Sequence, residues 1–258
     1  MEGPVRRILV FLTLSAALTA TISSAGLART QSGASASSAR RADKLPASLI
    51  GKEWSALPTK RRVVALTFDG GSGSEGVPLI LKTLQKTGVR GTFFLTGRFS
   101  ELYPRSTRAI SARYPIGNHS FDHPHLTALS NAAVWGEITH AQRVIKKISG
   151  QNPRPLFRFP YGDSNSRVIG IANGLGYGGI RWTIDTLGWE GTAQGQSTAK
   201  VLARVRSELR PGAIVLMHLG AAPDSSTLDA HALSRVIAVI RARGYGFATL
   251  DQFLAKKS

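Results

Sequence analysis

The sequence contains no cysteine. Neither disulfide bonds nor thiolate metal ligands are available, so a metal bound by this chain has to be held by histidine and carboxylate side chains. Acidic residues are also scarce, because 15 Asp and Glu stand against 33 Lys and Arg, for a formal net charge of +18. This excess favours polyanionic partners such as an anionic cell wall, and a simply soluble basic surface is the alternative. The basic residues are scattered without a basic-aromatic stripe, which argues against nucleic acid as a partner.

A long apolar run occurs only near the start, at residues 8–22. Arg6 and Arg7 precede it, and small residues lead from it to Ala28. These features are typical of a signal peptide, so we expect residues 1–28 to direct export and to be removed. A retained membrane anchor is the alternative, although the run is shorter than the ~20 apolar residues of a span. Both interpretations predict an extracytoplasmic protein, and the first predicts one that is secreted or associated with the cell wall and has no membrane span after processing.

The remaining chain divides by composition. Residues 29–57 are predicted to form a flexible linker, because their first part is rich in Ser, Ala and Arg and offers little to bury. Residues 58–258 are predicted to form a single domain, within which strand and helix patterns alternate. Strands are predicted at residues 62–68, 91–95, 156–159, 179–184, 213–217 and 245–249, and helices near residues 77–87, 134–148, 167–175, 198–209 and 233–242. This alternation indicates an α/β fold with parallel strands covered by helices, either an open sheet or a barrel.

Polar side chains follow several of the predicted strands. Asp69, Arg158, Asp185 and His218 each stand at the end of an apolar segment, and the loop of residues 117–123 follows another. In parallel α/β folds the chemistry lies at the carboxyl ends of the strands. Any one of these residues alone could be a cap, a surface cation or a hydrogen-bonded core histidine. Together, at one edge of a sheet, they predict a functional site.

Two histidines in that loop have a spacing suited to metal binding. His119 and His123 are four residues apart, which lets two imidazoles converge on one cation. Gly117 before them and Pro124 after them predict a loop or a single turn rather than a long helix. The pair is not an HExxH motif, because residue 120 is serine.

Five short motifs occur in an order that resembles the polysaccharide deacetylase family, also called carbohydrate esterase family four. They are Thr67-Phe68-Asp69-Gly70-Gly71, His119-Ser120-Phe121-Asp122-His123, Arg158-Phe159-Pro160-Tyr161, Trp182-Thr183-Ile184-Asp185 with Trp189, and Leu216-Met217-His218. The resemblance spans about residues 60–255. It implies a distorted (β/α) barrel in one domain and a divalent metal, usually zinc, held by an Asp-His-His set.

The resemblance also implies a role for each matching residue. His119 and His123 would be metal ligands, Asp69 the general base, Arg158 the residue that orients Asp69, and His218 the acid whose pKa Asp185 tunes. The Tyr161 backbone N–H would help to hold the oxyanion, while Trp189 and Leu216 would line a slot for the acetyl methyl group. The implied reaction is hydrolysis of an N-acetyl amide on a glycan such as peptidoglycan or a chitin-like polymer of N-acetylglucosamine. The family resemblance implies no oligomeric state.

The sequence departs from the family pattern at two positions. Gly70 stands where the family has a second aspartate that binds the metal, and Gly188 stands where an aspartate often precedes the tryptophan. Three outcomes are open for the first gap: Asp69 turns to the metal; water, Asp122 or Glu75 completes the ligand set; or the metal binds poorly. We expect an active enzyme. The alternatives are an esterase acting on O-acetyl groups and a non-catalytic module that binds cell-wall glycan, with a nucleic acid binder as a remote fourth.

Overall fold

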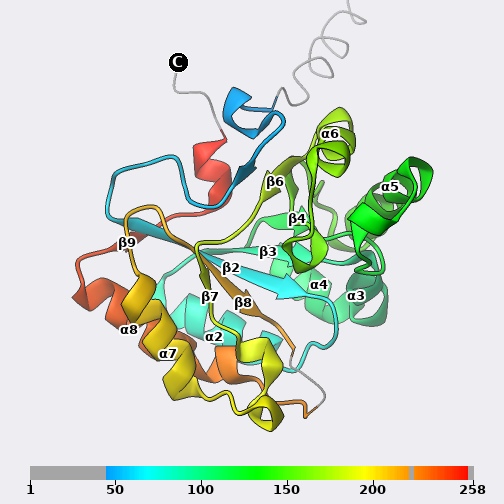
Figure 1. Ribbon diagram of the computed structural model, residues 1–258. Coiled ribbons are helices and arrows are strands. Elements are labelled where there is room, and N and C mark those ends of the chain that lie inside the picture. Colours follow the sequence, from blue (N-terminus) through cyan, green and yellow to red (C-terminus); the bar gives the residue numbers. More distant parts are fainter. Residues whose placement is uncertain (1–44, 221–223, 255–258) are drawn as a thin grey trace, which may run out of the picture. The chain divides into compact units, whose positions relative to one another are not determined.

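The fold is built on a parallel sheet (Figure 1), and the computed structural model describes residues 45–220 and 224–254. The strands are β1 (Glu53–Trp54), β2 (Val63–Gly70), β3 (Gly91–Leu95), β4 (Ile116–Asn118), β5 (Leu156–Phe157), β6 (Gly178–Ile180), β7 (Ile184–Asp185), β8 (Ile214–His218) and β9 (Gly246–Phe247). All of these strands pair in parallel. The α-helices are α2 (Val77–Thr87), α3 (Gly97–Leu102), α4 (Pro104–Ser111), α5 (Asn131–Ser149), α6 (Ser166–Gly174), α7 (Thr198–Glu208) and α8 (Leu228–Ala242).

The order of the strands shows that the sheet is curled. The order is β1-β6-β5-β4-β3-β2-β8-β7, with β9 beside the start of β2. In a flat sheet β6 and β7 would be six strand spacings apart, about 29 Å. Only residues 181–183 connect them, and the four Cα–Cα steps from Ile180 to Ile184 reach at most about 15 Å. The two ends of the sheet therefore have to curve toward each other, which confirms the predicted distorted (β/α) barrel.

Strand β2 lies at the centre of this sheet and separates two apolar layers. Val64, Leu66 and Phe68 belong to the core between the sheet and the helices, whereas Ala65 belongs to the core inside the curl. Successive side chains of a strand point to opposite faces. Asp69 therefore shares the inner face of the curl with Ala65, and position 70 shares the outer, helix-covered face with Phe68.

The helices cover the outer face of the sheet with one apolar stripe each. Val77, Ile80 and Leu84 of α2 are buried at helical spacing, and the helix ends at Gly88, whose φ of 67° suits a left-handed cap. Helices α2, α7 and α8 lie together on one side (Figure 1), where α8 packs against both of the others. The predicted positions of these helices are confirmed, except that α8 begins five residues before the predicted start at residue 233.

Two predictions about the chain's organisation need correction. The strand predicted at residues 179–184 is two strands, β6 and β7, which lie near opposite ends of the sheet. The linker predicted at residues 29–57 extends too far, because residues 45–57 are folded: β1 pairs with β6, and Leu49, Trp54 and Leu57 are buried. The spacing of these three residues follows neither a helical nor a strand period, so the sequence did not indicate their burial. They pack in the core inside the curl, which also contains Ile180, Ile214 and Leu250.

Helices α3 and α4 were not predicted. They are short, of six and eight residues, and carry few apolar positions from which a period could be recognised. No helix in the described ranges is long and apolar enough to cross a membrane. The predicted export segment, residues 1–28, lies outside these ranges and stays a prediction.

Candidate active site

A cavity of about 880 Å³ opens at the carboxyl ends of the parallel strands. Eight of the nine predicted site residues line it: Asp69, His119, His123, Tyr161, Asp185, Trp189, Leu216 and His218. The ninth, Arg158, has no exposed surface and contacts Asp69 from within the barrel. Residues from five different strand ends therefore meet at one place, as the motif positions predict.

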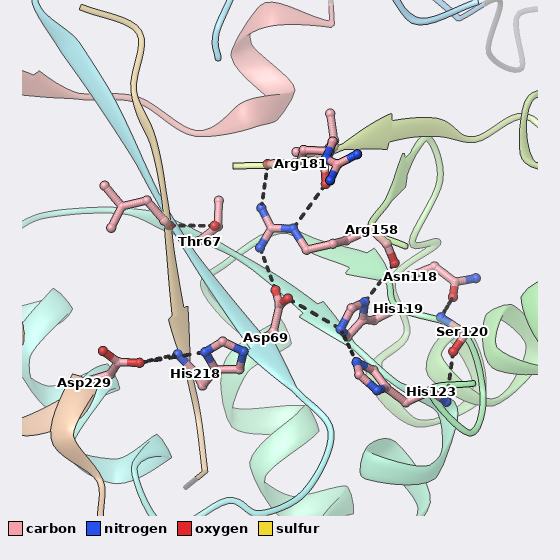
Figure 2. A network of polar contacts seen from close by, with 12 residues as sticks. Thr67, Asp69, Asn118, His119, Ser120, His123, Arg158, Arg181, His218 and Asp229 are labelled. Atoms are coloured by element: carbon pink, nitrogen blue, oxygen red, sulfur yellow. Dashed lines mark hydrogen bonds and ion pairs between the residues drawn. The ribbon is translucent and has the colours of Figure 1, made fainter. Parts of the chain in front are cut away.

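Asp69 is held by a buried ion pair. Arg158 Nη1 donates to Asp69 Oδ1 at 2.6 Å, and the Asp69 side chain is 5% exposed. The same guanidinium donates to the backbone carbonyls of Ile180 and Arg181, each at 3.2 Å, and it lies over the ring of Phe94 at 4.2 Å. Figure 2 shows that the other carboxylate oxygen of Asp69 faces His119. One oxygen of Asp69 is thus occupied, and the second, Oδ2, is presented to the two histidines.

His119 and His123 point their Nε2 atoms at each other, 3.1 Å apart (Figure 2). Asp69 Oδ2 lies 3.4 Å from His119 Nε2. His119 Nδ1 donates to the Arg158 carbonyl at 2.8 Å, so the free electron pair of this imidazole is on Nε2. A carbonyl partner on the far nitrogen is the arrangement that metal-binding histidines use.

Hydrogen bonds from β4, from within the loop and from α5 fix the loop between these histidines. The Ser120 N–H donates to Asn118 Oδ1 at 2.9 Å, and the His123 N–H donates to Ser120 Oγ at 3.0 Å. Glu137 of α5 accepts from the N–H groups of Phe121 and Asp122, each at 2.9 Å. Sequence reasoning missed the positioning roles of Asn118 and Glu137. No local pattern could reveal Glu137, because it reaches the loop from the next helix.

Both imidazoles are neutral at physiological pH. Burial lowers the pKa of His119 to about 3, and it lowers that of His123 to about 4 with a further contribution from its neighbour His119. Neutral imidazole is the form that binds metal. At the tetrahedral angle, two nitrogens each about 2.0–2.1 Å from a zinc ion are about 3.3 Å apart, which is close to the observed separation. The pair therefore fits a divalent cation.

A third protein ligand is not assembled beside this pair. Within residues 45–220 and 224–254, no group of three or more His, Asp or Glu side chains is arranged to hold a metal ion. A Cβ on Gly70 would lie 2.9 Å from side-chain atoms of Leu95 and Leu219 and 3.4 Å from Phe99, which all belong to the core between the sheet and the helices. A side chain at position 70 would therefore point into apolar surroundings, which agrees with its place on the outer face of β2.

Of the two carboxylates considered beside Asp69, only Glu75 is at the cavity. Asp122 instead forms a salt bridge with Arg98, and both side chains are largely exposed. Asp69 itself has Oδ2 near the pair. The candidate ligands are therefore the two imidazoles, with Asp69 and Glu75 as the carboxylates nearest to hand.

His218 ends β8 on the opposite side of Asp69 from the two histidines, and its side chain is 24% exposed (Figure 2). Burial lowers the pKa of His218 to about 4. Asp185, expected to tune this histidine, lines the cavity and accepts from the Leu187 N–H at 2.9 Å; that role stays a prediction. The carboxylate in contact with His218 belongs to Asp229, with Oδ2 3.9 Å from His218 Nδ1. Sequence reasoning missed Asp229.

Aromatic side chains form the exposed rim of the cavity. Tyr161 is 59% exposed, and its ring stacks on His125 with centroids 4.2 Å apart. Trp189 is 44% exposed and lies 6.2 Å from the His218 ring, while Leu216 is buried in the wall. Tyr161 has a φ of 59°, and four other non-glycine residues have positive φ in the described part of the chain: Ser120, His123, Leu187 and Ser225. All five belong to the loops around the cavity, where such backbone strain is typical of functional sites.

Comparisons with known proteins agree on one family. The family model described as polysaccharide deacetylase matches residues 56–180. The chain is 31% identical over 200 residues to the peptidoglycan-N-acetylmuramic acid deacetylase PdaA of Bacillus subtilis, covering 77% of this chain and 74% of that protein. The solved structure of PdaA, a family 4 carbohydrate esterase, matches with a TM-score of 0.74 at 30% identity, over 82% of this chain and 89% of the chain in that structure.

Two further relatives show that similarity of this degree does not by itself establish activity. The chain is 34% identical over 214 residues to the peptidoglycan-N-acetylglucosamine deacetylase PgdA of Listeria monocytogenes, covering 83% of this chain but spanning only 43% of that protein. A family 4 pseudoenzyme from Bacillus anthracis is 31% identical with a TM-score of 0.69, over 76% of this chain and 66% of that one. Similarity of this degree therefore extends to both enzymes and an inactive relative.

Proposed function

This chain belongs to the polysaccharide deacetylase family, and from that premise we propose that it hydrolyses acetyl groups from N-acetylated glycans. The observation that carries the proposal is the pairing at Asp69: Arg158 holds Oδ1, and Oδ2 faces His119 and His123. His218 lines the same cavity and supplies a second proton-transfer group. A carboxylate base, an imidazole acid and a pair of neutral imidazoles that can hold a cation are groups that metal-assisted amide hydrolysis uses.

Asp69 and His218 would move the protons of the reaction. Asp69 Oδ2 takes a proton from water as the water oxygen adds to the amide carbonyl carbon. His218 gives a proton to the departing nitrogen as the C–N bond breaks, so that the products are an amine and acetate. Each positioned transfer contributes about 10²–10⁴-fold to the rate. Arg158 keeps Asp69 aimed at the cavity, and the Tyr161 backbone N–H is proposed to donate to the developing oxyanion.

His119 and His123 would hold a divalent cation, which we propose to be zinc. A cation bound there polarises a carbonyl oxygen and makes nearby water more acidic. Glu75 is proposed to complete the ligand set, because Asp69 Oδ2 serves as the base, Gly70 supplies no side chain and its outer-face neighbours are apolar. A site whose third ligand is not held beside the two imidazoles should bind zinc more weakly than one with a dedicated third ligand.

The substrate is proposed to be peptidoglycan or a related polymer of N-acetylated sugars. The relatives are named for N-acetylglucosamine and N-acetylmuramic acid in peptidoglycan, and another for chitooligosaccharides. Trp189 and Tyr161 offer exposed aromatic surface for a sugar ring, and Leu216 with Trp189 is proposed to contact the acetyl methyl group. A peptidoglycan substrate would lie outside the cytoplasm, which agrees with the export signal proposed for residues 1–28. The net charge of +18 is compatible with attraction to an anionic wall.

Binding without catalysis is the second candidate, favoured by Gly70 and by the likeness to a pseudoenzyme. Acetate release separates the two. The protein is stripped with a chelator, then assayed on N-acetylated peptidoglycan and chitin fragments with and without added zinc or cobalt, beside Asp69→Asn as the inactive control. Release that returns with metal and is absent in Asp69→Asn supports the deacetylase. Glycan binding without release, equal in both proteins, supports the binding module, and release from O-acetyl substrates alone supports an esterase.

A further inference from the structure

His218 has one ring nitrogen that no neighbouring group satisfies. Nδ1 is buried and has no hydrogen-bond partner in the described part of the chain. The other ring nitrogen, Nε2, is on the side of the ring that faces Asp69 and the cavity (Figure 2). An imidazole that delivers a proton from Nε2 has to keep its Nδ1 proton, and a partner at Nδ1 decides which nitrogen carries the proton.

Asp229 lies against this unsatisfied nitrogen. It belongs to the first turn of α8, is 2% exposed, and its Oδ2 accepts from the His218 backbone N–H at 2.8 Å. The same oxygen lies 3.9 Å from Nδ1, a distance that a small rotation of the ring closes. Asp229 Oδ1 has no partner, and burial raises the pKa of Asp229 to about 7. A buried, half-satisfied carboxylate is a poor way to stabilise a fold, which points to a role in the site.

Gly188 makes the space for this carboxylate. A Cβ at position 188 would lie 2.4 Å from Asp229 Oδ1 and 2.5 Å from its Cγ, closer than non-bonded atoms approach. Any side chain at position 188 would therefore displace Asp229. The glycine that departs from the motif in the sequence is thus explained by a group from a helix more than 40 residues further along.

We propose that Asp229 is the positioning residue of His218: it holds the Nδ1 proton toward α8 and so leaves Nε2 to face the cavity. The inference rests on the proposed function, in which the His218 imidazolium gives its Nε2 proton to the leaving nitrogen. After that transfer the neutral imidazole keeps its Nδ1 proton, which hydrogen-bonds to the Asp229 carboxylate. Asp185, which lies nearer the cavity, has no such contact with His218 among the described hydrogen bonds and ion pairs.

A purely structural role for Asp229 is the competing explanation, and Asp229→Asn distinguishes the two. Asparagine keeps an oxygen for the His218 N–H and keeps the volume, but its neutral amide oxygen accepts the Nδ1 proton more weakly than a carboxylate does, and its second position carries an NH2 donor. The other charged and titratable groups that act on His218 are Asp69, His119, His123 and Arg158, with Asp185 acting on Asp229. All of them remain in the variant, so a change at His218 reports on Asp229 alone.

The test is the ¹⁵N NMR spectrum of the His218 ring in metal-free protein at pH 8, where Asp229 is ionised. The parent protein is expected to carry the proton on Nδ1, and Asp229→Asn is expected to shift it to Nε2. Asp251→Asn, a change of the same kind at an exposed position, should keep the parent spectrum. An identical ring tautomer in the parent and in Asp229→Asn overturns the proposal. This measurement needs no turnover, so it stands even if the protein releases no acetate.

Kinetics and a glycine variant complete the test. In a parent that releases acetate, Asp229→Asn should lower kcat by ~10-fold or more, change KM by less than ~3-fold, and move the basic limb of the pH profile to lower pH. Gly188→Ala should reproduce these effects by displacing Asp229, and the double variant should be no slower than either single one. Gly136→Ala, at a position with open space, is the matched control. Parent-like kcat and pH profile in Asp229→Asn overturn the proposal.

Discussion

Replacing Arg158 by methionine should destabilise the protein far more than replacing an exposed arginine. Arg158 has no exposed surface, and its guanidinium serves Asp69 Oδ1 and the carbonyls of Ile180 and Arg181. Methionine keeps most of the volume but leaves a buried carboxylate and two carbonyls without their donor. Breaking a buried ion pair by removing one partner costs about 3–5 kcal/mol. We therefore expect Arg158→Met to lower the free energy of unfolding by at least ~3 kcal/mol.

The assay is urea denaturation of metal-free protein. With a slope of ~2 kcal/mol/M, the expected loss moves the midpoint by ~1.5 M or more. Arg98→Met removes the exposed partner of Asp122 and should change the midpoint little, because water screens that pair. Asp69→Asn combined with Arg158→Met should be more stable than Arg158→Met alone, since it removes the unpaired charge. A loss below ~1 kcal/mol in Arg158→Met, or no recovery in the double variant, would refute this account of the ion pair.

Three further predictions concern the histidines and the rim of the cavity. Burial holds the pKa of His119 near 3, whereas in the unfolded chain it is about 6.5, so unfolding takes up a proton between these values. The metal-free protein should therefore keep its stability above about pH 6.5 and lose it as the pH falls toward 4, at up to ~1.4 kcal/mol per pH unit from His119. In urea titrations at pH 7.5 and 5, His119→Gln should reduce the difference in unfolding free energy between the two pH values. His123→Ala should weaken zinc binding by ~100-fold or more in calorimetric titration, and unchanged affinity would remove this histidine from the ligand set. Trp189→Ala should raise KM for glycan oligomers more than it lowers kcat, and the reverse pattern would move Trp189 from binding to catalysis.

Most of the polar residues that meet in the cavity could be predicted because they stand at the end of an apolar strand or directly after it. Parallel strands bring their carboxyl ends to one edge, so Asp69, His119, His218 and the others needed no long-range information beyond strand polarity. The alternation along β2 even determines that Asp69 faces inward. Motif order added the roles, and the geometry at Arg158 and His119 is compatible with them.

What could not be predicted depends on contacts between distant segments. The division of residues 179–184 into β6 and β7 is invisible locally, because the apolar pattern continues across both strands while their partners lie on opposite sides of the sheet. Trp54 and Leu57 look like linker residues until the inner core surrounds them. Asp229 follows no strand and belongs to no motif, so the only local trace of its role was the missing side chain at Gly188.

The short connection between β6 and β7 bears on which residues can be taken as signs of present activity. Residues 181–183 join β6 and β7, which lie near opposite ends of the sheet, and the Arg158 guanidinium reaches from the carbonyls of Ile180 and Arg181 across to β2 through Asp69. A protein that had lost catalysis would still need these contacts to hold the curled sheet together. The presence of the Asp69–Arg158 pair is therefore explained by its structural role as well as by catalysis. The cavity-facing nitrogen of His218 takes no part in these contacts, so its protonation is where present activity can be told apart from descent from an active enzyme.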